Sequence, residues 1–153
     1  MAPFKLDNIL IIYPKSESTL VQFGLNDETF TVPEFEIPTK IYKSIDDENK
    51  YYSSEEYRTL EVSPIRNGSI ANLPAFLQFL KIIYGSVLSK AREDIKAAMT
   101  SEAYIGNSPD LTNIAVMIVS QSSWSTLEQE RITQFCFEHL KMNNLLFVQS
   151  LSL

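Results

Sequence analysis

Apolar residues near the start of the chain fall into two short runs joined by a polar turn. Ile9 to Tyr13 and Thr19 to Phe23 are rich in β-branched and aromatic residues, and Pro14 to Ser18 between them suits a hairpin turn. Thr29 to Val32 alternates polar and apolar residues, which predicts a third, half-buried strand. Prolines bracket the apolar residues that follow, which favours the edge of a sheet. The beginning of the chain therefore predicts a sheet that opens with an antiparallel hairpin.

The next part of the chain is polar and then returns to extended patterns. Residues 43–56 predict a solvated excursion, and their acidic DDE run lacks the alternating ligand spacing of a calcium loop. Residues 57–62 resume an extended pattern, and Asn67-Gly68 is a strong turn signal. These residues predict short strands and turns, with no metal site.

From Asn72 the apolar period changes to that of a helix. Large apolar residues recur at three- and four-residue steps as far as Leu88, and Asn72 can cap this helix. Residues 89–103 contain good helix formers with a thin apolar stripe, which predicts a separate surface helix. Ile114 to Val119 is continuously apolar, as is typical of a strand covered on both faces.

The last part of the chain predicts one more helix and one more strand. Ser125 and Glu128 fit a capping box, with a helix running to about Leu140, and Leu145 to Val148 forms a short apolar run. Strands come first and helices then alternate with apolar strands. That order predicts an α/β fold, a mixed sheet with an antiparallel start and parallel crossovers.

Composition narrows the class of protein. The chain has 153 residues, a net charge of -6 and one cysteine, Cys136. An acidic chain has no overall basic field to attract nucleic acid, so any connection to nucleic acid would run through a partner. A single cysteine excludes an internal disulfide and favours a reducing compartment. The start of the chain lacks the features of a signal peptide, and no apolar run approaches the roughly 20 residues of a membrane helix. The composition predicts a soluble intracellular protein.

Candidate catalytic residues are few. His139 is the only histidine, and it falls in the last turn of a predicted helix, where a surface position is expected. Cys136 lies three residues earlier and is interpreted as a core residue rather than a nucleophile. No Walker-type, GxGxxG or HExxH motif is present. Trp124, in a polar loop, could anchor a partner or serve local packing, and the sequence leaves both open. No catalytic residue and no metal site is predicted.

Three blocks of the sequence, taken in order, resemble the N-terminal part of the actin family. LIIYPKSESTLVQFGLND has the layout of the actin opening: a strand, a phosphate turn, a second strand and an Asp-containing loop. PIRNGSIANLPAFLQFLKIIYGSVL is similar to the Pro-Ile-x-x-Gly segment that runs through Asn into a helix. ERITQFCFEHLKMNNLLFVQSLSL resembles a helix, a strand and the Leu-Ser-Leu that opens the hinge between the two actin lobes.

Within that family the chain is similar to actin-related subunits of the SWI/SNF and RSC chromatin remodelling complexes. The stretches that carry this similarity are MAPF, NILIIYP, ETFTVPEFEIP, EIPTKIY and Ser123-Trp124-Ser125. The resemblance implies a nuclear scaffold that forms a heterodimer with another actin-related protein. It also implies docking on the helicase/SANT-associated helix of the remodeller ATPase, with chromatin contacted indirectly and no direct DNA contact.

The resemblance covers nearly the whole chain and implies an incomplete actin-like (RNase H-like) fold. Residues 1–153 would form the N-terminal lobe, with a small-subdomain insertion at about residues 33–70 and an end at the interdomain hinge. Residues 43–61 differ in content from the actin loop at the tip of that subdomain, so polymerisation through the loop is not expected. Residues 89–112 are longer than the equivalent actin connection.

In actins the first hairpin turn supplies an Asp, two glycines and a Lys to a metal-bound nucleotide. Alignment on Phe23 replaces every one of these residues. Tyr13 stands at the Asp, Pro14 at the neighbouring Asn and Lys15 at the first glycine, while Glu17 stands at the second glycine and Leu20 at the Lys. With Ser16, these residues make up the degenerate turn.

These replacements oppose phosphate binding. Pro14 has no N–H to donate, and Leu20 removes a cationic contact of about 4 kcal/mol near a surface, before desolvation. Glu17 adds a repulsive charge if it faces the triphosphate, whereas Lys15 could compensate in part. We therefore expect a structural turn, no cofactor and a non-enzymatic scaffold. An actin-like ATPase or cytoskeletal protein is the alternative, and an unrelated α/β binding domain is the third reading.

Overall fold

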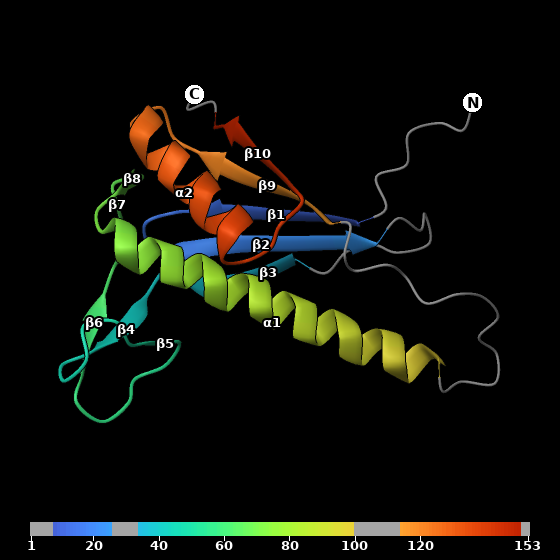
Figure 1. Ribbon diagram of the computed structural model, residues 1–153, viewed down its shortest axis with the longest axis horizontal. Coiled ribbons are helices and arrows are strands. Elements are labelled where there is room, and N and C mark those ends of the chain that lie inside the picture. The colour runs from blue at the N-terminus through green and yellow to red at the C-terminus, as the bar shows by residue number, and fades with distance from the viewer. Residues whose placement is uncertain (1–7, 26–33, 100–113, 151–153) are drawn as a thin grey trace.

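The computed structural model describes residues 8–25, 34–99 and 114–150, and a mixed sheet lies at its centre (Figure 1). In the described residues this sheet has five strands in the order β10-β9-β1-β2-β3. β1 pairs with β2 and β2 with β3 in antiparallel fashion. β9 pairs with β1 and β10 with β9 in parallel fashion. The strands are β1 (Asn8–Pro14), β2 (Ser18–Leu25), β3 (Glu34–Pro38), β9 (Ile114–Ser120) and β10 (Asn144–Gln149).

The antiparallel hairpin at the start of the chain is confirmed. Tyr13 pairs with Leu20, and Pro14 pairs with Thr19 at the end of the ladder. β3 is an edge strand of the sheet, as its flanking prolines predict. The strand expected over residues 29–32 lies outside the described residues.

Residues 41–70 form two smaller sheets outside the main one. A three-stranded sheet contains β4 (Ile41–Ser44), β5 (Tyr51–Tyr52) and β6 (Thr59–Val62) in the order β5-β4-β6. β7 (Ile65–Arg66) and β8 (Ser69–Ile70) form a hairpin. Its turn is Asn67-Gly68, whose positive φ angles of 51° and 79° suit these two residues. The excursion over residues 43–56 is mostly exposed, as predicted, but β5 within it pairs with β4.

A single long helix, α1 (Leu73–Met99), occupies the region where two helices were expected. The separation near residue 88 was wrong because Gly85 is accommodated within the helix and no proline follows it before Met99. Ala91, 7% exposed, continues the inner stripe. α2 (Thr126–Glu138) begins as predicted, since Ser125 and Glu128 form a reciprocal capping box.

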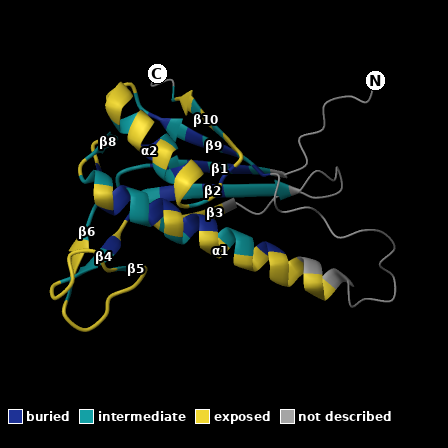
Figure 2. Ribbon diagram, in the orientation of Figure 1, coloured by how far each residue is buried: buried dark blue, intermediate teal, exposed yellow. Residues whose placement is uncertain are grey.

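Both helices lie on the same face of the main sheet (Figures 1 and 2). The connections β3 to β9 and β9 to β10 cross the sheet in the same direction, so right-handed crossovers place α1 and α2 on one side. The core lies between that face and the helices, with Leu10, Ile12 and Ile118 fully buried.

The other face of the sheet is only partly covered within the described residues. β9 alternates buried and half-buried residues, so the expectation of a strand covered on both faces was wrong. Leu146 on β10, which pairs with Met117, is 57% exposed on this face. The continuous apolar run of β9 therefore corresponds to a strand with one buried face and one half-buried face.

Candidate functional site

The turn between β1 and β2 is held by three backbone N–H groups. Lys15 donates its N–H to the carbonyl oxygen of Ser18 at 3.0 Å, which closes the turn. Thr39 donates its N–H to the Glu17 carbonyl at 3.0 Å. Gly68, in the β7–β8 turn, donates its N–H to Ser16 Oγ at 3.0 Å. The turn is thus fixed between the start of the small sheet and the β7–β8 hairpin.

The side chains at the candidate phosphate positions surround Tyr13, apart from Glu17. The Tyr13 hydroxyl lies 3.1 Å from Ser150 Oγ, at the end of β10. Lys15 Nζ lies 5.9 Å from the centre of the Tyr13 ring. Leu20 is opposite Tyr13 in the ladder and lies on the sheet face away from the helices, whereas Glu17 is exposed. The fold therefore brings Tyr13, Lys15 and Leu20 near one another and leaves Glu17 exposed.

A cavity of about 770 Å³ lies beside this turn, and its charge opposes anions. Glu17 and Glu36 line it together with a single cation, Lys40. Ser18 Oγ donates to Glu36 Oε1 at 2.7 Å, so one serine of the turn is directed to a carboxylate. Two carboxylates against one ammonium group repel a triphosphate.

Two backbone positions of the turn offer no donor to an anion. Pro14 has no N–H, and the N–H of Lys15 is used within the turn. The hydroxyl oxygen of Ser16 accepts the N–H of Gly68, which fixes this side chain while its O–H remains a donor. The contact with Gly68 was missed from the sequence because its two residues are 52 positions apart, and only the turn signal Asn67-Gly68 was visible.

Trp124 has a packing role, and its alternative role as a partner contact is not supported. Its side chain is 4% exposed, and its indole N–H donates to the Gly68 carbonyl oxygen at 2.8 Å. Its ring meets Phe76 edge to face, with centroids 5.5 Å apart. Ser69 Oγ donates to Ser123 Oγ at 2.8 Å in the same junction. A residue enclosed in this way offers a partner almost no surface.

The two candidate nucleophile and base residues are not arranged for catalysis. Cys136 is fully buried, and burial raises the pKa of its thiol to about 12, so the reactive thiolate is disfavoured. His139 is exposed at the C-cap of α2, with its ring 5.2 Å from that of Phe135. Cys136 is a core residue, as the sequence indicated.

The described part of the chain holds neither a cluster of metal ligands nor a membrane-spanning helix. There, no group of three or more His, Cys, Asp or Glu side chains could hold a metal ion. Asp46, from the acidic run, instead pairs with Arg58 through Oδ2 and Nε at 3.0 Å. No described helix combines the length and apolar character needed to cross a membrane.

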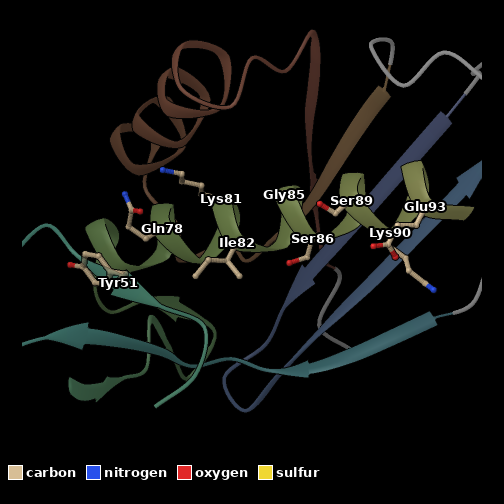
Figure 3. A pocket seen from close by; sticks show the side chains of 9 residues that line it. All are labelled: Tyr51, Gln78, Lys81, Ile82, Gly85, Ser86, Ser89, Lys90 and Glu93. Atoms are coloured by element: carbon tan, nitrogen blue, oxygen red, sulfur yellow. The ribbon is translucent and has the colours of Figure 1, made fainter. Parts of the chain in front are cut away.

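An open groove of about 690 Å³ runs along the outer side of α1 (Figure 3). Its lining is mixed, with Tyr51 at one end, Gly85 and Ser89 in the middle and Glu93 at the other end. No cluster of catalytic groups is present among these residues, so the groove is a surface feature of the helix.

Comparison with solved structures identifies the fold. The MreB5 protein of Spiroplasma citri bound to ADP superposes with a TM-score of 0.61 at 12% identity, over 93% of this chain and 38% of that one. The same protein bound to AMPPNP gives 0.57 at 13% identity, over 95% of this chain and 39% of that one. The chain therefore has an actin-like α/β fold, in incomplete form, and spans about two-fifths of these structures.

Comparison by sequence adds no closer relative. No family model matches the chain, and no curated protein sequence matches it. At 12% and 13% identity, the structural likeness defines the fold alone. The division into an N-terminal lobe with an insertion at about residues 33–70 stays a prediction.

Proposed function

We propose that this chain is part of a non-catalytic actin-related subunit that scaffolds a nuclear ATP-dependent chromatin remodelling complex. The actin-like fold supports this proposal. Its finer part comes from the resemblance of the short stretches named above to subunits of SWI/SNF and RSC, in particular yeast actin-related protein nine. In this role the protein forms a heterodimer with another actin-related protein and binds the helicase/SANT-associated helix of the remodeller ATPase. Chromatin is contacted indirectly, and the protein is located in the nucleus.

One observation carries the non-catalytic part of the proposal. The strands that frame a phosphate turn are present, but the turn carries Tyr13, Pro14, Glu17 and Leu20 where a nucleotide site needs an acid, backbone donors and a cation. Its Ser16 hydroxyl is bound to Gly68, and two carboxylates line the adjacent cavity. Such a turn supports the hairpin without contributing to nucleotide binding.

The alternative is a nucleotide-binding actin-like ATPase or a cytoskeletal protein. MreB5 of Spiroplasma citri was crystallised with ADP and with AMPPNP, so the fold itself is compatible with nucleotide. The replaced turn residues argue against that activity here. The different content of residues 43–61 argues against polymerisation through the small subdomain.

Affinity purification from nuclear extract tests the proposal. Tagged protein at its native expression level should recover a second actin-related protein and the ATPase of a remodeller, and recovery of the ATPase should depend on its helicase/SANT-associated helix. A tagged unrelated nuclear protein of similar acidity is the control for nonspecific binding. Absence of both partners, with the tagged protein folded and in the nucleus, would overturn the assignment.

A further inference from the structure

A second groove, of about 580 Å³, lies between α1 and the neighbouring strands β3 and β4. Most of its wall is apolar. The α1 side contributes Phe79, Ile82, Ile83 and Val87, and the strand side contributes Val21 and Ile37. Volumes of this size are typical of binding sites that combine apolar walls with a few polar groups.

The groove is open to solvent along one side, and this favours a polypeptide segment over a small molecule as its occupant. Phe35, in the wall, is 42% exposed, and Pro38, Ser53 and Ser86 in the same lining are exposed. A small amphiphile in this groove would keep one side in water, whereas ligand sites usually bury 70–90% of a small ligand. A polypeptide segment covers the open side with its own polar face.

A helix fits this groove better than an added strand. From Phe79 to Lys90 the wall follows α1 for roughly 16 Å, which is about three turns of a second helix laid beside it. β3 is short and ends at Pro38, and proline at an edge strand hinders the addition of another strand. Amphipathic helices bind apolar grooves through residues spaced three and four apart.

The charges of the groove select an acidic partner. Lys40 and Lys90 are the charged residues in its lining, although the chain as a whole carries -6. Lys40 Nζ lies 3.4 Å from Glu61 and Lys90 Nζ 3.5 Å from Asp94, with all four side chains about half exposed or more. Exposed pairs of this kind contribute little, about 0–1 kcal/mol, so each ammonium can turn to a partner's carboxylate.

The view along α1 agrees with this arrangement. Ile82 and Lys90 point from the helix toward the strands, whereas Lys81 and Gln78 point to the opposite side (Figure 3). The apolar wall and one of its two cations therefore lie on the same side of α1. Glu93, on the outer groove, is not part of this lining.

We propose that the groove between α1 and β3–β4 binds an amphipathic helical segment of a partner protein. Its apolar face fills the space between Phe35 and Ile82, and its Glu or Asp residues pair with Lys40 and Lys90. This inference does not rest on the assignment to a chromatin remodeller, because it depends only on the shape and charge of the groove.

Two synthetic peptides test the proposal directly. Both have 20 residues with Leu at three- and four-residue steps, and they differ only in carrying Glu or Lys at the flanking positions. Fluorescence anisotropy with labelled peptide should show saturable binding of the Glu peptide and at least tenfold weaker binding of the Lys peptide. Equal binding of the two peptides, or no binding of either at 1 mM peptide (about 4 kcal/mol of binding free energy), would overturn the proposal.

Variants locate the binding. Lys40→Glu with Lys90→Glu should weaken the Glu peptide at least tenfold, and Phe35→Ser should weaken both peptides. Arg131→Glu, which reverses an exposed cation on α2, is the matched control and should leave binding unchanged. Circular dichroism melting confirms that each variant is folded.

Self-association provides the remaining check. If light scattering shows a dimer of this chain that Phe35→Ser converts to monomer, the occupant is a second copy and the acidic partner is excluded. If the chain stays monomeric while the double charge reversal weakens the Glu peptide, the proposal is supported.

Discussion

The indole N–H of Trp124 donates a 2.8 Å hydrogen bond to the carbonyl oxygen of Gly68. Gly68 donates its own N–H to Ser16 Oγ at 3.0 Å. One glycine thus connects the start of α2 to the turn between β1 and β2. Trp124 therefore stabilises the turn between β1 and β2 indirectly, through Gly68.

Trp124→Phe should lower the free energy of unfolding by about 1–2 kcal/mol, because the aromatic packing remains while the Gly68 carbonyl loses its donor. Trp124→Ala, which also removes the contact with Phe76, should cost about 3–5 kcal/mol. Urea denaturation followed by circular dichroism measures both. Ser123→Ala removes only the exposed hydrogen bond to Ser69 and serves as the control, with a cost within about 0.5 kcal/mol.

Thr19 and Thr39 share a buried hydrogen bond of 2.7 Å between their hydroxyl groups. Replacing either residue with Val leaves the other hydroxyl buried without this partner, which should cost about 1–3 kcal/mol. Replacing both should cost much less than the sum of the single changes, because no polar group then remains unpaired. A double-mutant cycle by urea denaturation measures the coupling, and additive costs would contradict it.

Gly85→Ala should raise the free energy of unfolding by about 0.5–1 kcal/mol, because glycine weakens a helix interior. A Cβ at Gly85 meets nothing within 4 Å, so no clash opposes the gain. The matched control is Gly68→Ala. Gly68 has φ of +79°, and a Cβ there would lie 3.3 Å from Gln121 Cγ, so this change should destabilise by about 1–2 kcal/mol. Thermal melting distinguishes the two signs.

Cys136 should not react with a thiol reagent in the folded protein at pH 8, because burial raises its pKa from 9.0 to about 12. Denaturant should restore the reaction. The raised pKa also has a consequence for stability. The contribution of the thiol is fully present below pH 9, where both states are protonated, and it is lost as pH rises toward 12, where only the unfolded state has released its proton.

Cys136→Ala provides the comparison for that pH dependence. Urea denaturation at several values between pH 8 and 11 should show a steeper loss of stability in the natural chain than in the variant. Equal slopes in the two proteins, or rapid labelling of the folded natural chain at pH 8, would contradict the enclosed position of Cys136.

The full-length protein should show no saturable ATP binding at micromolar concentrations, and Lys15→Ala should not change that result. Isothermal titration calorimetry provides the measurement, with MreB5 of Spiroplasma citri, whose structures contain ADP and AMPPNP, as the positive control. Micromolar affinity that disappears in the Lys15→Ala protein would show that the turn holds phosphate after all.

Local signals in the sequence predicted much of the fold. The capping box of Ser125 and Glu128 fixed the start of α2, and Asn67-Gly68 fixed a turn, because each depends on residues within a few positions of one another. The order of the strands and helices gave the mixed sheet for a similar reason, since right-handed crossovers leave few topologies.

Features that depend on distant residues were missed. Burial of Trp124 requires Gly68 and Phe76, which lie far away in the chain. The alternating exposure of β9 depends on which face carries the helices, and a run of apolar residues does not contain that information. The continuity of α1 was missed because a thin apolar stripe was taken as the start of another helix.

The hydrogen bonds that hold the turn have one more consequence, for how such a protein changes over evolution. The chain leaves the main sheet where the N–H of Thr39 is bonded to Glu17, and it comes back to the β1–β2 turn where the N–H of Gly68 is bonded to Ser16. Residues 39–68 therefore form a loop whose two ends are held together by these hydrogen bonds. The entropy cost of closing such a loop grows only slowly with its length. Insertions and deletions in the exposed residues 45–50 and 53–58 can therefore accumulate at little cost to the core, whereas Tyr51 of β5, which lies between them and packs against the core, constrains the excursion.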